Sequence, residues 1–91
     1  MAGAKVMTRH PQGKRGRTIP EADYELFKRA IVSTLRGREL THTELVDQLQ
    51  QRLRRGFDGN ISWYAMTVKL DLEARRIIER TASTPQRYRL P

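Results

Sequence analysis

The fold of this chain is decided by residues 60–90, NISWYAMTVKLDLEARRIIERTASTPQRYRL. Apolar residues recur at helical spacing from Ile61 to about Arg75. Two short runs that favour β-structure follow at residues 77–80 and 87–90, with a loop between them. The stretch therefore predicts a helix that runs directly into a two-stranded β-hairpin.

Two further amphipathic helices are expected before this stretch. The first should span Ile19–Arg36, and the second should run from about residue 41 to the glycine at residue 56. Each begins with a Thr-x-x-Glu pattern, at Thr18 and at Thr41, which is typical of a capping box. Leu40 lies in a short extended segment that should form a third strand beside the hairpin. The fold class expected is α+β, mainly α, with three helices.

The predicted third helix, which has Ser62 as its expected N-cap and reaches about Arg75, has two apolar faces. The first consists of Tyr64, Ala65, Val68 and Leu72, and the second of Trp63, Met66, Leu70 and Ala74. A surface helix normally has one such face, packed on the core. The second face predicts either packing against the hairpin or the N-terminal segment, or a contact of Trp63, Met66 and Leu70 with a protein partner or a second copy.

The chain is short and basic. Its 91 residues make one domain, and its formal net charge is +8. Residues 1–17 hold five Lys or Arg side chains and no acid, so most of the excess charge lies there. We expect residues 1–17 to be a basic flexible arm and residues 18–91 to be the folded domain. Such a charge distribution favours a polyanionic partner, although solubility alone also accounts for it.

The arm contains Lys14-Arg15-Gly16-Arg17, which resembles the core of an AT-hook, with Thr18 in the place of the proline that follows in the hook. The resemblance implies that Lys14, Arg15 and Arg17 bind duplex DNA. Arginine side chains enter the narrow, negative minor groove of A·T-rich DNA, so a basic arm adds affinity even without the hook. The alternative is a solvated tail.

The order of three helices and a hairpin, with LEARRIIER at residues 72–80 leading into the hairpin, resembles the winged helix-turn-helix superfamily of bacterial transcription regulators. The family usually has glycine where Arg76 stands. Arg76 is therefore expected either to adopt a left-handed conformation or to mark a different exit from the helix. The segment SWYAMTVKLDL at residues 62–72 also resembles a small bacterial family of unassigned function.

The resemblance to winged helices implies a C-terminal β-hairpin wing and binding of double-stranded DNA by a transcription regulator or accessory factor. The helix at residues 61–75 would be the recognition helix, with Ser62, Thr67 and Lys69 as its candidate base contacts. Phosphates would be contacted by the arginines around it, Arg75, Arg76, Arg80, Arg87 and Arg89. Charge on outward strand positions also prevents edge-to-edge pairing of strands, which is an equally good reason for Arg87 and Arg89.

Two alternatives to DNA binding are considered. The first is a protein-interaction or dimerisation module that uses Trp63, Met66 and Leu70, because a fold does not by itself determine a function. A second is RNA binding, which the basic composition permits. Catalysis is not expected, since the chain has no cysteine, two histidines on separate elements, and no phosphate-binding or nucleophile motif. We predict no catalytic, cofactor-binding or metal-binding residues, no small-molecule substrate, no membrane span and a cytoplasmic location.

Overall fold

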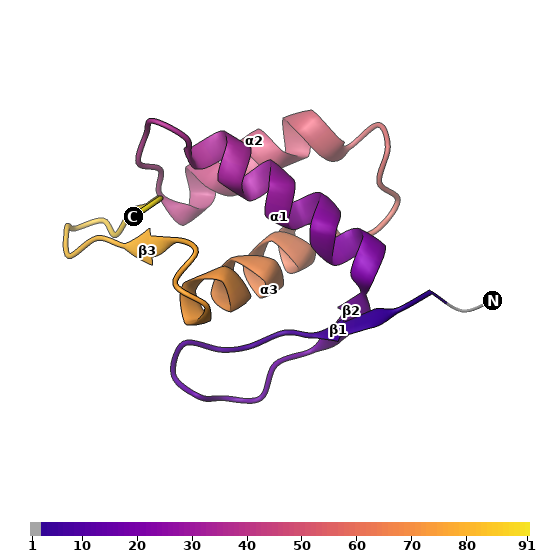
Figure 1. Cartoon of the computed structure of the whole chain (residues 1–91). Coiled ribbons are helices and arrows are strands. Elements are labelled where there is room, and N and C mark those ends of the chain that lie inside the picture. Colours follow the sequence, from indigo (N-terminus) through magenta and orange to yellow (C-terminus); the bar gives the residue numbers. More distant parts are fainter. Residues whose placement is uncertain (1–2) are drawn as a thin grey trace.

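The computed structural model describes residues 3–91 and is α+β, with three helices and two small antiparallel strand pairs (Figure 1). The elements are, in chain order, β1 Lys5–Met7, β2 Thr18–Pro20, α1 Glu21–Leu35, α2 His42–Leu53, α3 Ile61–Ala74, β3 Glu79–Arg80 and β4 Tyr88–Arg89. β1 pairs with β2, and β3 pairs with β4. No helix among the residues that the structure describes is both long enough and apolar enough to cross a membrane.

The core lies where the three helices meet. The expected apolar faces of α1 and α2 are confirmed, because Phe27, Ile31, Leu45 and Leu49 have no exposed surface. The first apolar face of α3 is confirmed as well, with Ala65, Val68 and Leu72 at 0–1% exposure. Phe57, in the turn between α2 and α3, packs edge-on against Phe27 with ring centroids 5.0 Å apart.

The starts of the helices test the capping predictions. At α2 the capping box is confirmed, since Thr41 Oγ1 accepts from Glu44 N at 3.2 Å and Thr41 N donates to Glu44 Oε1 at 2.8 Å. At α1 it is wrong: the helix begins at Glu21, after Pro20, because Thr18 belongs to a strand. At α3 the cap is Asn60 and not Ser62, with Asn60 Oδ1 accepting from Trp63 N at 2.9 Å.

The C-terminal hairpin follows α3 through a left-handed residue. Arg76 has φ 62°, which confirms the first of the two conformations expected for it. The strands are shorter than predicted, with the register Glu79↔Arg89 and Arg80↔Tyr88. Leu40 forms an antiparallel bridge to Tyr88, with Leu40 N donating to Tyr88 O at 3.1 Å and Tyr88 N donating to Leu40 O at 2.7 Å. The predicted third strand is therefore present as a single bridged residue.

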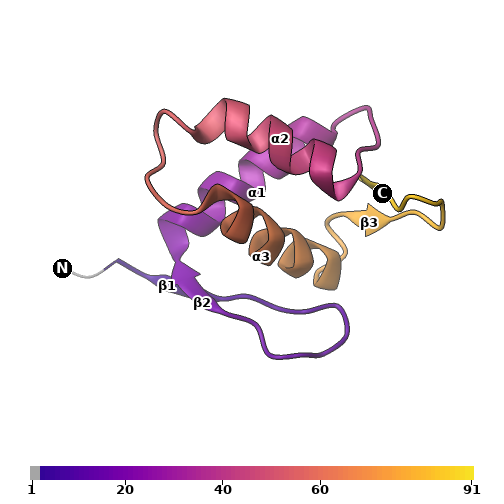
Figure 2. The same ribbon diagram turned by 180° about the vertical axis from the view of Figure 1, so that it is seen from behind.

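Within residues 3–17 the N-terminal segment forms a strand and a loop where a flexible arm was expected over residues 1–17, of which residues 1 and 2 lie outside the described part of the chain. β1 and β2 form a hairpin in which Val6 pairs with Ile19, and Ile19 is 2% exposed in the core. Residues 8–17, which we call the basic loop, connect the two strands. The basic loop runs along α3 on the side away from α2 (Figures 1 and 2). Charge and glycine content indicated neither the strand pairing that places Ile19 in the core nor the packing of the loop on a helix.

Candidate nucleic-acid interface

Two of the three base contacts predicted on α3 are buried. Thr67 is 7% exposed and Lys69 is 5% exposed, so in this structure both side chains are covered by the protein and neither is presented to a nucleic acid. Lys69 Nζ lies 4.0 Å from the centroid of the Tyr88 ring, a cation–π contact that holds the amine between α3 and the C-terminal hairpin. Ser62 is exposed near the start of α3. The helix thus presents no cation at the positions where base readout was expected.

Most of the predicted phosphate-binding arginines already have acidic partners. Arg75 Nε lies 2.9 Å from Asp71, Arg80 Nε lies 2.7 Å from Glu73, and Arg89 bonds Glu39 at 2.9 Å and Glu79 at 2.7 Å. These hydrogen bonds raise the pKa of all three guanidinium groups above the ordinary value. In each pair the carboxylate offsets the charge of the arginine, which weakens its attraction for a phosphate even though other N–H donors of the guanidinium group stay available.

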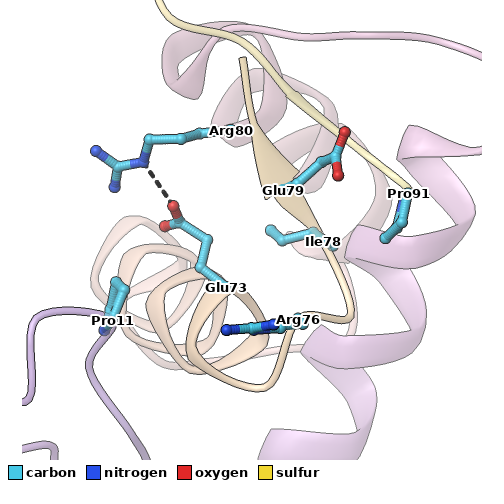
Figure 3. Close-up of a pocket in the computed structure, with 7 residues that line it drawn as sticks. All are labelled: Pro11, Glu73, Arg76, Ile78, Glu79, Arg80 and Pro91. Atoms are coloured by element: carbon cyan, nitrogen blue, oxygen red, sulfur yellow. Dashed lines mark hydrogen bonds and ion pairs between the residues drawn. The ribbon is translucent and has the colours of Figure 1, made fainter. Parts of the chain in front are cut away.

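Arg76 and Arg87 differ from these three. Both are exposed, and neither has an ion pair with an acid within residues 3–91. Arg76 borders an open pocket of about 550 Å³ between the end of α3 and β3 (Figure 3). Pro11 of the basic loop lines the same pocket, so Arg76 lies beside that loop. The Glu73–Arg80 pair also lines the pocket. Of the two arginines that line this pocket, Arg76 has no carboxylate partner in the described residues.

The basic loop holds four of the five cationic residues of the expected arm, and the fifth, Lys5, lies in β1. Its ends are joined by three hydrogen bonds between Thr8 and Arg17: Thr8 N to Arg17 O at 2.8 Å, Thr8 Oγ1 to Arg17 O at 3.0 Å and Arg17 N to Thr8 Oγ1 at 2.8 Å. Gly16 is required there, because a Cβ atom would lie 1.8 Å from Thr8 O. The cationic side chains on the loop are all exposed: Arg9, Lys14, Arg15 and Arg17.

The loop is concave on the side that faces α3. An open pocket of about 520 Å³ lies there. The loop residues that line it include Arg9, His10, Lys14 and Arg15, and Ala74 of α3 lines it from the helix. No acid lines this pocket, and none occurs in the sequence before Glu21. Because fields of like charge add in a concave surface, this pocket favours an anion.

The loop is held on α3 by a buried carboxylate. Asp71 has no exposed surface and accepts hydrogen bonds from Arg9 N at 2.8 Å, from the Tyr24 hydroxyl at 2.5 Å and from Arg75 Nε at 2.9 Å. Burial, and to a smaller extent the hydrogen bond from the Tyr24 hydroxyl to Asp71, raises the pKa of Tyr24 to about 12. The sequence analysis assigned no role to Asp71. An acid at the edge of an apolar face was the only available signal.

The second apolar face of α3 is partly open. Met66 is 44% exposed, while Trp63 and Leu70 on either side of it are half-buried. We call these three residues the apolar strip. Trp63 packs edge-on against Tyr64, with ring centroids 5.0 Å apart. The strip is therefore joined to the core through the indole ring of Trp63, and its exposed member is the Met66 side chain.

The arrangement offers binding groups and few catalytic ones. Within residues 3–91 no three histidine, aspartate or glutamate side chains lie together as metal ligands would. Burial, helped by the nearby Lys69 charge, lowers the pKa of His42, and Nδ1 of His42 is buried without a hydrogen-bond partner in the described residues. His10 lies in the basic loop, where Nδ1 accepts from Gln12 N at 3.1 Å. The two imidazoles thus have separate structural surroundings.

Comparison with known proteins gives one relationship. Neither a curated protein nor a solved structure was found to match the chain. Residues 5–88 match a family that is described as "Family of unknown function (DUF6958)". The matched stretch begins in β1, so it includes the basic loop together with the three helices and most of the C-terminal hairpin. Because the match covers nearly the whole chain, this protein belongs to the DUF6958 family.

Proposed function

We propose that this protein is a small winged-helix protein that binds duplex DNA, with the basic loop as its main contact. The observation that supports the proposal is the arrangement of charge on that loop. Four exposed cationic side chains lie on residues 8–17, and none of them forms an ion pair within the described part of the chain. A duplex carries one phosphate charge per about 1.7 Å of axis, so a compact row of cations is complementary to it.

Arg76 adds a fifth cation beside the loop, across the pocket that Pro11 also lines. The proposal gives Arg80 and Arg89 a lesser part, because acids already bind them. The outward side of α3 contributes the Ser62 hydroxyl and no cation, so we expect weak sequence preference. Binding of this kind suits an accessory factor or a regulator of transcription in the cytoplasm, and it requires no catalytic group.

The winged-helix assignment rests on resemblance in the order of elements. α1, a bridged residue at Leu40, α2, α3 and a C-terminal hairpin follow one another in the order of that superfamily. The basic loop is an addition at the N-terminal side of this arrangement. In the proposed complex the loop and Arg76 contact the DNA backbone, and Arg87 on the hairpin adds a further phosphate contact.

Duplex binding is tested by fluorescence anisotropy with a short generic duplex, from about 50 to about 200 mM salt. Neutralisation of about five phosphates predicts a slope of log K against log salt of roughly −4 to −5. A flat dependence, or no binding at the lower salt, would rule out the proposal. If an RNA duplex or a single strand competes better than the DNA duplex, that nucleic acid and not duplex DNA is the preferred partner.

The location of the interface is tested by matched charge reversals. Lys14→Glu with Arg15→Glu should weaken duplex binding by roughly 10- to 100-fold, because two phosphate contacts are replaced by repulsion. Arg54→Glu with Arg55→Glu is the control: it changes the net charge equally at two exposed residues beyond α2, on the opposite side of the molecule from the loop (Figure 2). Equal losses in the two double variants would mean that net charge, and not the basic loop, governs binding.

A protein-interaction module is the second candidate function, and the exposure of Met66 favours it. Met66 is an exposed and adaptable apolar side chain, and the half-buried Trp63 and Leu70 beside it extend the apolar surface available to a partner. Sedimentation at increasing concentration tests self-association through the apolar strip. Association that Met66→Glu abolishes would support this candidate, whereas a wild-type protein that stays monomeric would exclude a homodimer through the strip.

A further inference from the structure

The strongest unexplained feature outside the proposed contact surface is the fully buried Asp71. Its carboxylate is shared by three parts of the chain, through Arg9 N of the basic loop, the Tyr24 hydroxyl of α1 and Arg75 Nε just beyond α3. Hydrogen bonds to an ionised carboxylate are shorter and stronger than bonds between neutral groups. A carboxylate in the interior needs such partners, so the loop and the acid depend on each other.

The bond from Arg9 N has a particular place among the contacts of the loop. The bonds between Thr8 and Arg17 close the loop on itself and do not fix its position relative to the helices. Within residues 3–91, the bond from Arg9 N to Asp71 is the hydrogen bond that joins residues 8–17 to a helix. Together with the pairing of β1 and β2, it therefore sets where the cationic side chains of the loop lie relative to Arg76.

We propose that Asp71 positions the basic loop for binding to a polyanion, although it touches no ligand itself. This inference rests on the proposed function and adds to it how the contact surface is kept in place. A loop that is already ordered loses less conformational entropy when it binds than a mobile one does. Removal of the Asp71 carboxylate would let the loop move and would lower affinity.

The sign of the effect separates positioning from simple electrostatics. Removal of a negative charge near a cationic surface strengthens binding to DNA if charge alone matters, because attraction to the phosphates increases. The positioning role predicts the opposite sign for Asp71→Asn. Asp58→Asn is the matched control, since Asp58 is exposed in the turn before α3 and has no hydrogen bond to the loop.

Asp71→Asn should weaken duplex binding roughly 10-fold, because the amide keeps one acceptor oxygen but lacks the charge that strengthens the bond from Arg9 N. Asp58→Asn should bind like wild type or up to about twofold more tightly. Tyr24→Phe is a second control: it removes a donor to the same carboxylate but leaves the bond from Arg9 N in place. It should bind within about twofold of wild type. Circular dichroism confirms that each variant is folded.

A pair of variants on the loop keeps the inference testable if Asp71→Asn does not fold. Arg9→Ala and Arg9→Pro both remove the guanidinium group, but only proline also removes the N–H donor. Proline at this position restricts Thr8 to extended conformations, which suit a residue that directly follows β1. Arg9→Pro should bind the duplex roughly 10-fold more weakly than Arg9→Ala.

Limited trypsin cleavage after Lys14 and Arg15 reports the position of the loop independently of DNA. Cleavage should be roughly 10-fold faster in Asp71→Asn and Arg9→Pro than in their controls, because an unheld loop fits the protease more readily. Unchanged cleavage, or faster cleavage with unchanged or tighter DNA binding, would overturn the positioning role alone. A wild-type protein that cleaves slowly but binds no duplex would overturn the proposed function and not the hold of Asp71 on the loop.

Discussion

Gly16→Ala is the substitution for which the structure predicts the largest effect outside the core. An added Cβ would lie 1.8 Å from Thr8 O and 2.8 Å from Thr8 Oγ1. Neither the backbone oxygen nor the hydroxyl can yield without separating Thr8 from Arg17. The three hydrogen bonds between these two residues would then be lost or weakened.

The expected cost follows from those bonds. Each contributes about 1 kcal/mol net, so the free energy of unfolding should fall by roughly 2–3 kcal/mol. For a domain of this size the melting temperature should fall by roughly 10–20 °C. Thermal unfolding followed by circular dichroism gives the global value. Hydrogen exchange at the Thr8 and Arg17 amides shows whether the loop has opened locally.

Gly56→Ala provides the matched control. Nothing lies within 4 Å of a Cβ at this position, so the free energy of unfolding should change by less than about 0.5 kcal/mol. The reasoning is refuted if Gly16→Ala keeps both the wild-type stability and the protection of the Thr8 and Arg17 amides. It is also refuted if the two glycine variants lose equal stability, since the close contact exists at only one of them.

Three further predictions concern residues whose roles the structure has changed. Lys69→Met should leave duplex affinity within about twofold of wild type, because the amine is buried over Tyr88, and it should raise the pKa of His42 as measured by NMR titration. The pKa of Tyr24 is raised in the folded state, so its stabilising effect is complete below the unfolded pKa near 10 and is lost as the pH rises through about 12. Unfolding free energies at alkaline pH should therefore fall more steeply in wild type than in Tyr24→Phe, and parallel curves would contradict this. Arg89→Ala should weaken duplex binding much less than Lys14→Ala in the anisotropy assay, because Glu39 and Glu79 already bind Arg89.

The helical part of the fold was predictable because it depends on local periodicity. Apolar spacing located all three helices, and the Thr41–Glu44 pattern gave the start of α2 correctly. The left-handed Arg76 was also among the expected conformations, since a helix that turns sharply into a strand needs a positive φ there. These features are set by residues close to one another in the chain.

The features that were wrong depend on contacts across the chain. The Thr18–Glu21 spacing fits a capping box, but Thr18 pairs with Met7 in the N-terminal hairpin and is not available as a cap. Lys69 was expected at the surface because lysine is rarely buried, yet the Tyr88 ring covers it. Neither partner is near in sequence, so a local pattern could not reveal the contact.

The candidate site was predictable in composition and not in arrangement. The charge of Lys14, Arg15 and Arg17 marked the N-terminal segment as the cationic region, and these residues remain exposed. What the pattern lacked was the backbone bond from Arg9 N to Asp71, to which the side chain at position 9 contributes nothing. A bond from a backbone amide is open to almost any residue type and therefore leaves no trace in a sequence.

The contact between Arg9 and Asp71 also has a consequence for the order of events during synthesis. The two residues are 62 positions apart, so the loop leaves the ribosome long before the helix that holds it. Contacts of such sequence separation close late, because much of the chain between them must be ordered first. The cationic segment is thus made early, and its bond to Asp71 can form only after α3 has been synthesised.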